Sequence, residues 1–118
     1  MKQTPKIIFL FFFATSKMMA QNLVPNPSFD NFISCPTGAS QINLATPWND
    51  ANGGSSDYFN ACAPSSGVSM PFLLYSEYAE YSHSGSGMAG IFVYQVNGNY
   101  REYIEVQLVD SLQMGKCY

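Results

Sequence analysis

The chain of 118 residues has room for one domain, and its charge limits what that domain can contact. Lysine and arginine together number five, and aspartate and glutamate number eight, for a formal net charge of −3. Three of the lysines lie within the first twenty residues, so the remainder has two basic residues against eight acidic ones, a net charge of −6. Such an acidic chain lacks the electrostatic footprint of a protein that binds nucleic acid or anionic membrane.

Residues 1–20 have the three-part pattern of a secretory signal peptide. Lys2 and Lys6 precede an unbroken apolar run, Ile7–Ala14, and Ala20 supplies a small residue at the expected cut. Two features depart from the pattern, since Lys17 lies late and a methionine stands where a second small residue is usual. The apolar run is far short of the roughly 20 residues that a spanning helix needs. We therefore predict a secreted protein, extracellular or on the outer cell surface, with no membrane span after cleavage; the alternative is an uncleaved N-terminal strand or anchor.

Three cysteines follow the predicted cut. In an oxidising compartment Cys35 and Cys62 could close a loop worth roughly 3.5 kcal/mol in chain entropy. Cys117 would then be left for a partner outside this chain, or as a buried free thiol. No C-x-x-C spacing occurs, so the sequence does not support a zinc or redox motif.

Residues 21–118 form the predicted domain, in which short apolar pieces alternate with turn residues. Asn22–Phe32 contains two prolines and indicates an edge strand broken by a turn. Short strands are predicted at Gln41–Leu44 and Met70–Tyr75, and a single helical turn at Ser76–Tyr81. No segment keeps apolar residues at helical spacing over three turns. The pattern therefore favours an all-β fold, a β-sandwich or a relative of it.

The strongest pattern is Ala89–Val109, in which two β-type runs flank Asn97-Gly98. That dipeptide favours a type I′ hairpin turn, which would pair Val96 with Asn99. One face of the hairpin would then enter the core, with Gln95 and Glu102 as its polar exceptions. The members of this predicted core face are Ala89, Ile91, Val93, Tyr100, Ile104, Val106 and Leu108. The opposite face, suited to solvent or to a ligand, carries Phe92, Tyr94, Arg101, Tyr103, Glu105 and Gln107.

Two motifs in the chain resemble known binding loops without their context. Gly85–Gly90 matches G-x-G-x-x-G, but polar residues precede it and a predicted strand follows, so a dinucleotide site is not expected. Asp50–Gly53 begins like an EF-hand loop but lacks its later glycine and glutamate. Asp50 and Asp57 therefore remain candidates only for an irregular calcium site, and an ordinary turn rich in Asn and Asp is the simpler interpretation.

Nothing in the sequence indicates catalysis. Glu77 and Glu80 lie three residues apart on a predicted exposed turn, whereas glycosidases hold two carboxyl groups across a cleft. His83 stands among serines without a partnered nucleophile or a second histidine. We therefore predict that the protein is not an enzyme.

Aromatic side chains are the best candidates for ligand contact, because flat rings stack on sugars while Arg, Asn and Glu bond hydroxyl groups. The predicted ligand-binding residues are Tyr94, Arg101, Tyr103 and Trp48. Tyr94 would face Arg101 across the hairpin, where a cation–π contact is natural. The alternative is that the rings fill the core or its rim, and this alternative is favoured for Trp48.

Several segments also occur in a recognisable order: NLVPNPSFD, CP, TPWN, DYFNACAP, SGSGMAGIFVY, NYREYIEVQL and GKCY. This order, spanning Asn22–Tyr118, resembles the N-terminal carbohydrate-binding-like module of large secreted gliding-motility-associated proteins of Bacteroidota. The resemblance implies a galactose-binding-like β jelly roll and supports pairing of Cys35 with Cys62. It also implies a possible structural calcium ion on Asn26 and Asp30, although the family usually has glutamate at the second position.

Related modules continue past the GK-x-Y element with further strands, and their hosts run to hundreds of residues. The resemblance therefore implies a jelly roll that is incomplete at its C-terminus, a fragment or truncated reading frame of a protein with further domains. The predicted function is a non-catalytic module that binds extracellular polysaccharide or another cell-surface polymer. The alternative is a structural or adhesion module with no sugar site, and a hydrolase would need residues beyond Tyr118.

Overall fold

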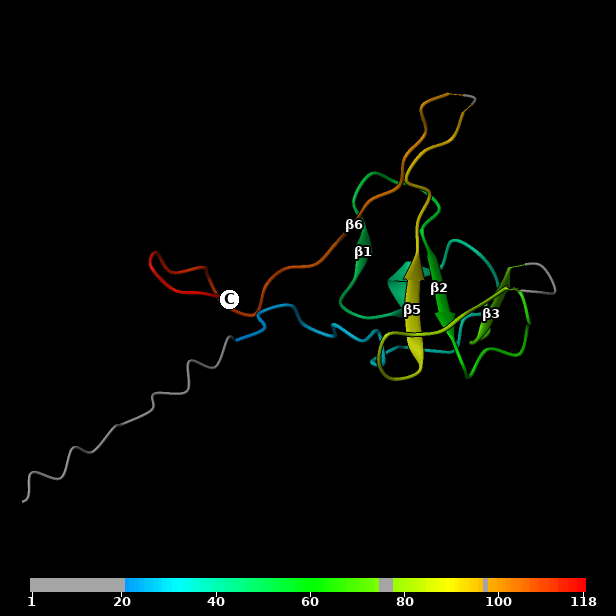
Figure 1. The fold of residues 1–118 in the computed structure, drawn as a ribbon, viewed down its shortest axis with the longest axis horizontal. Helices are drawn as coiled ribbons and strands as arrows, with labels where there is room; N and C mark the ends of the chain where they lie inside the picture. The colour runs from blue at the N-terminus through cyan, green and yellow to red at the C-terminus, as the bar shows by residue number, and fades with distance from the viewer. Residues whose placement is uncertain (1–20, 75–77, 97) are drawn as a thin grey trace, which may run out of the picture.

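The computed structural model describes residues 21–74, 78–96 and 98–118 (Figure 1). The predicted signal peptide, residues 1–20, lies outside the described residues, as do Tyr75–Glu77 and Asn97. The described part contains short strands and one 3-10 turn but no α-helix, which confirms the all-β prediction, and none of its helical turns could cross a membrane. The elements are η1 (Ile42–Leu44), β1 (Asn49–Asp50), β2 (Asp57–Asn60), β3 (Phe72–Leu74), β4 (Tyr78–Glu80), β5 (Gly87–Gly90) and β6 (Ile104–Glu105).

The strands pair as separate two-stranded antiparallel sheets: β1 with β6, β2 with β5, and β3 with β4. The longest ladder runs from the Asp57–Gly90 pair to the Asn60–Gly87 pair. The β3–β4 ladder corrects one prediction, because 78–80 form a strand where a helical turn was expected. An isolated helical turn is unstable in water, and β3 offers these residues a partner for their backbone hydrogen bonds.

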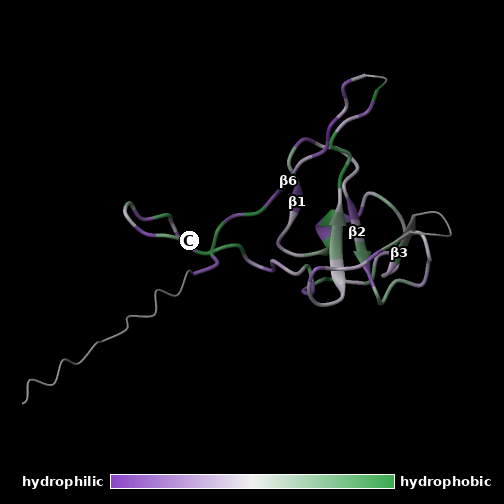
Figure 2. Cartoon of the chain, viewed as in Figure 1, coloured by the Kyte–Doolittle hydropathy of each residue, from purple (hydrophilic) through white to green (hydrophobic). Residues whose placement is uncertain are grey.

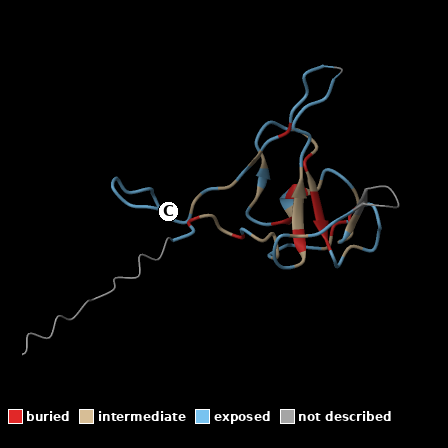
Figure 3. Cartoon of the chain, viewed as in Figure 1, coloured by how far each residue is buried: buried red, intermediate tan, exposed pale blue. Residues whose placement is uncertain are grey.

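The core is small and gathers around β2 and η1, where Figure 3 shows most of the buried chain. Its fully buried members are Ile42, Ala45 and Tyr58, and the half-buried residues packed against them are Phe29, Leu44, Trp48, Ala89 and Ile104. The predicted strand Gln41–Leu44 is wrong, since Ala45 N–H donates to the Ile42 carbonyl and closes a 3-10 turn. That turn directs the Ile42 side chain, 2 % exposed, into the core.

The first described segment is irregular where an edge strand was predicted over Asn22–Phe32. Asn26 and Phe29 both have positive φ angles, of 46° and 57°, and Phe29 N–H donates to the Asn26 carbonyl. The segment also meets the end of the chain, because Val109 N–H donates to the Leu23 carbonyl at 3.0 Å. Residues 21–25 and the C-terminal segment consequently lie side by side (Figure 1).

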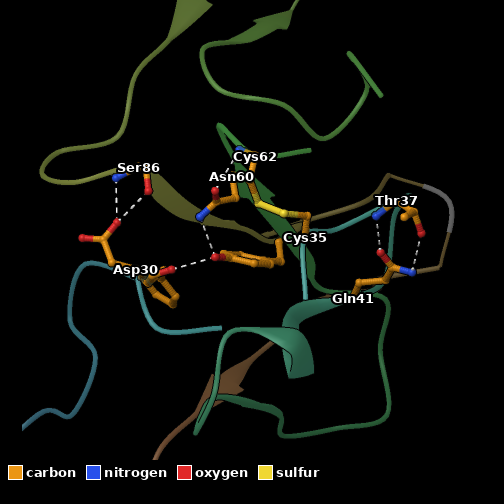
Figure 4. Close-up of a disulfide and its surroundings, with 9 residues drawn as sticks. Asp30, Cys35, Thr37, Gln41, Asn60, Cys62 and Ser86 are labelled. Carbon is orange, nitrogen blue, oxygen red and sulfur yellow. Dashed lines mark hydrogen bonds between the residues drawn. A yellow bond between two sulfur atoms is a disulfide. The ribbon is translucent and has the colours of Figure 1, made fainter. Parts of the chain in front are cut away.

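A disulfide joins Cys35 and Cys62, as predicted, with their Cα atoms 5.6 Å apart (Figure 4). It ties the loop before η1 to the residues that follow β2. Such a bond is compatible with an oxidising, extracellular compartment. Cys117 is a free and exposed cysteine, so the predicted alternative of a buried thiol does not apply.

The predicted hairpin forms a ribbon that projects from the sheets (Figure 1). We call residues 91–96 and 98–103 the ribbon. The Gln95–Tyr100 bridge agrees with the predicted register. Closer to the sheets the register slips by one residue, because Glu102 N–H donates to the carbonyl of Phe92 at 2.8 Å, and not to that of Val93.

The predicted core face of the hairpin is therefore only partly right. Ala89 and Ile104 pack against the core, but Ile91 is 42 % exposed and Val93 is 73 % exposed. Side chains that alternate between the two faces of a hairpin are buried on one face only where another layer of the protein covers that face. Among the described residues, no layer covers the projecting ribbon.

Candidate functional site

The ribbon brings three of the four predicted ligand-binding residues onto one projection. Tyr94 is 57 % exposed, Tyr103 is 52 % exposed, and Arg101 is exposed as well. Tyr94 comes directly before Gln95, and Arg101 comes directly after Tyr100. The two residues therefore lie next to the Gln95–Tyr100 bridge, one on each arm of the ribbon. The ribbon carries both hydrophobic and hydrophilic stretches (Figure 2).

The structure does not bring Trp48 to the ribbon. Its indole N–H donates to the Asn26 carbonyl at 2.9 Å, and its ring stacks on Phe29 with centroids 4.9 Å apart. The side chain is half-buried against the core cluster. This arrangement is the packing role given above as the alternative for Trp48.

Glu102 holds the base of the ribbon, a role that the sequence analysis did not identify. The side chain is 2 % exposed. Its Oε1 accepts from Ser55 N–H at 3.0 Å, from the Ser55 hydroxyl and from the Tyr100 hydroxyl, and its Oε2 accepts from Phe92 N–H at 2.9 Å. Burial raises the pKa of Glu102, but the bonds from Ser55, Phe92 and Tyr100 outweigh burial and leave the pKa below its ordinary value. The sequence contains one signal for this role, because Glu102 is a polar exception on the predicted core face of the hairpin.

The carboxylates considered for an irregular calcium site accept hydrogen bonds from the backbone instead. Asp50 Oδ1 accepts from Gly54 N–H at 3.0 Å and Asp50 Oδ2 accepts from Ser56 N–H at 3.3 Å, which folds the intervening loop. Asp57 Oδ1 accepts from Ser40 N–H at 2.6 Å. The same loop supports the ribbon, because the Asn52 side-chain amide donates to the Arg101 carbonyl at 2.8 Å.

A second cluster joins the N-terminal segment to the loop before β5 (Figure 4). Asp30 Oδ1 accepts from Ser86 N–H at 2.6 Å and from the Ser86 hydroxyl at 3.0 Å. The Ser86 amide, and then the Ser28 hydroxyl, hold the pKa of Asp30 below its ordinary value. Nearby, the buried Tyr58 hydroxyl donates to the Phe29 carbonyl at 2.8 Å and accepts from the Asn60 amide at 2.7 Å. Burial raises the pKa of Tyr58.

The glycines of the G-x-G-x-x-G sequence allow this close packing. Gly85 has a φ of +68°, and a Cβ there would overlap the Asp30 carboxylate. A Cβ at Gly87 would overlap the Phe29 carbonyl, and one at Gly90 would lie 2.6 Å from the Phe59 ring. Close packing against Asp30, Phe29 and Phe59 therefore explains the three glycines of the motif without a bound phosphate.

The side chains of Asn26 and Asp30, the predicted calcium ligands, are hydrogen-bonded within the chain in this arrangement. The Asn26 amide donates to the carbonyls of Asn31 and Thr46, both at 2.8 Å, while its oxygen accepts from Asn31 N–H at 3.0 Å. Asp30 Oδ1 accepts from Ser86, so each of the two predicted ligands already accepts an N–H donor of the chain. Within the described residues, no group of three or more His, Cys, Asp or Glu side chains is placed to hold a metal ion.

We accordingly expect calcium to leave the thermal stability unchanged. A ligand that binds only the folded state at one hundred times its dissociation constant adds about 2.7 kcal/mol. In a domain of this size that would raise the melting temperature by roughly 10 °C or more. Thermal unfolding followed by circular dichroism, with excess calcium or with EDTA, measures the difference. A saturable rise with calcium that Asp30→Asn abolishes would instead establish the predicted site.

The candidate site is thus a projecting aromatic ribbon held at its base by a buried carboxylate. Comparisons with protein-family models, with curated proteins and with solved structures found no match to this chain.

Proposed function

We propose that this protein is a secreted, non-catalytic module that binds extracellular polysaccharide or another cell-surface polymer through its ribbon. The proposal includes a galactose-binding-like jelly-roll architecture, of which the described strands would form part, and further domains of the same full-length protein. The exposure of Tyr94, Arg101 and Tyr103 on one projection is the observation that carries it. Exposed tyrosine rings offer an apolar face to a sugar ring, and arginine donates to its hydroxyl groups.

The second candidate is a structural or adhesion module with no sugar site. It is favoured by the aliphatic members of the same ribbon, since Val93 is 73 % exposed and Val96 is 81 % exposed. Exposed aliphatic side chains near aromatic ones are typical of protein contacts.

Affinity electrophoresis separates the two candidates. The full chain is run in native gels that contain laminarin, xylan, pectin or alginate. We expect retardation in at least one gel, and a loss of affinity of about tenfold in Tyr94→Ala and in Arg101→Ala, which corresponds to about 1.4 kcal/mol. Tyr81→Ala is the matched control, because Tyr81 is 71 % exposed but lies outside the ribbon.

Each result has a defined consequence. If the folded chain migrates identically in every gel, the adhesion candidate replaces the glycan-binding one. If Tyr81→Ala weakens retardation as much as Tyr94→Ala does, binding does not depend on the ribbon.

A further inference from the structure

A hollow of about 240 Å³ lies beside the Asp30–Ser86 contact, on the part of the chain away from the ribbon. Its apolar lining includes Pro27, Phe29 and Met88, and its polar lining includes Ser28, His83 and Ser84. The hollow thus combines an aromatic ring with two hydroxyl groups and an imidazole. In the sequence, His83 stood among serines and had no predicted role.

The walls of this hollow are fixed by contacts that do not require a ligand. The bonds from Ser86 to Asp30 hold the loop that contains His83 and Ser84 against the N-terminal segment. On the opposite wall, the Tyr58 hydroxyl bonds the Phe29 carbonyl, and Trp48 stacks on the Phe29 ring. Gly87 lets β5 approach Phe29 more closely than any side chain would allow. Because these contacts already order the walls, ordering the hollow would cost a ligand little conformational entropy on binding.

The lining restricts the chemistry of the ligand. It contains no lysine or arginine, and the Asp30 carboxylate, bonded to Ser86 beside it, would repel a phosphate or a carboxylate. Pockets for drug-sized ligands begin at about 300 Å³, so this hollow suits a single ring. The apolar face of such a ring could lie on Phe29 and Met88, while its hydroxyl groups bond Ser28, His83 and Ser84.

The geometry points to a binding site for one neutral pyranose ring in this hollow, separate from the ribbon. The inference rests on the proposed function, because it names a sugar subsite in a module proposed to bind glycan. The ribbon would contact an extended polymer, and the hollow would take a single sugar residue, a chain end or a side branch.

Nuclear magnetic resonance on the full chain tests the hollow directly. His83 is the one histidine of the sequence, so its ring signals report on this position alone. The probes are the methyl glycosides of glucose, galactose, mannose and xylose, added separately, and inorganic phosphate. With one of the glycosides we expect the His83 ring and the Met88 methyl signals to move along one saturation curve. The dissociation constant should be on the order of 1 mM, as befits a ligand of this size.

Substitutions locate the contact. His83→Ala and Ser84→Ala should each weaken the glycoside binding followed at Met88 by about fivefold, since each removes a hydrogen-bonding side chain. Ser66→Ala is the matched control for Ser84→Ala, because both serines are exposed and Ser66 lies outside the hollow. Tyr94→Ala should leave glycoside binding unchanged while it weakens polymer retardation.

The outcomes separate this inference from the proposed function. If polymers retard the chain but no glycoside moves the His83 and Met88 signals, the hollow is not a sugar site and the ribbon proposal stands. If a glycoside saturates the hollow while no polymer is bound, the hollow stands and the ribbon proposal fails. Saturation by phosphate in the absence of any glycoside effect would overturn the inference, as would equal weakening by Ser66→Ala and Ser84→Ala.

Discussion

Glu102→Ala is expected to lower the free energy of unfolding by roughly 3 kcal/mol, because the carboxylate satisfies several donors at once. The substitution removes the acceptor of the Ser55 and Phe92 amides and of two hydroxyl groups. The amides would be left partly buried without partners. In a domain of this size the melting temperature should fall by more than about 10 °C. Thermal unfolding at pH 7, followed by circular dichroism, gives the value.

Glu105→Ala is the matched control for Glu102→Ala. Glu105 is exposed and pairs through its backbone with Asn49, so truncating its side chain should change stability by less than about 0.5 kcal/mol. Equal losses in the two variants would show that Glu102 does not anchor the ribbon.

The pH dependence provides a second readout of the same anchor. Because the folded pKa of Glu102 lies below its ordinary value, its contribution is fully present above about pH 4.5. That contribution is lost as the pH falls through the folded pKa, since the protonated side chain accepts less well. We expect Glu102→Gln, which has no charge to lose, to show a flatter stability curve than the wild type over this acidic range. A wild-type curve as flat as that of Glu102→Gln would contradict the assignment.

Loss of the Cys35–Cys62 disulfide should have an effect of similar size. The bond spans 27 residues, and closing a loop of that length contributes roughly 3.5 kcal/mol in the chain-entropy account. Small domains have about 5 to 15 kcal/mol in total, and this core has few buried side chains, so the loss would remove a large share of the stability. Urea unfolding of the double variant Cys35→Ser, Cys62→Ser measures the shift in midpoint.

Cys117→Ser serves as the control for the disulfide variant, because that cysteine is exposed and free. It should unfold at the wild-type midpoint, and a reducing agent should shift the wild type to the midpoint of the double variant. A double variant as stable as the oxidised wild type would show that the disulfide does not contribute to the free energy of unfolding.

The sequence predicted what depends on local pattern. Frequent Pro, Gly and Asn residues indicated an all-β chain, Asn97-Gly98 placed the bridge between Gln95 and Tyr100, and the disulfide was anticipated. Tyr94 and Tyr103 are exposed as expected, but so is Val93 on the opposite face, so alternation along the hairpin does not account for their exposure.

Contacts between distant residues could not be predicted in this way. Asp30 and Ser86 are 56 residues apart, and nothing in either neighbourhood marks the other as its partner. The register slip beside Glu102 was missed for a related reason. The carboxylate binds Ser55, which is 47 residues away, and alternation within a hairpin carries no information about that contact. The face assigned to the core failed because it assumed a covering layer that the described residues do not supply.

The backbone hydrogen bond from Val109 N–H to the Leu23 carbonyl bears on how the protein can be attached to a surface for binding measurements. The two chain segments that it joins lie well apart from the projecting ribbon (Figure 1), and the exposed Cys117 thiol follows shortly after Val109. A sensor surface or fluorophore coupled to that thiol through maleimide chemistry would therefore orient every molecule alike, with Tyr94 and Arg101 facing the solution. After residue 20 the only lysine is Lys116, which lies beside the same thiol, so amine coupling at that residue would attach the molecule at the same end.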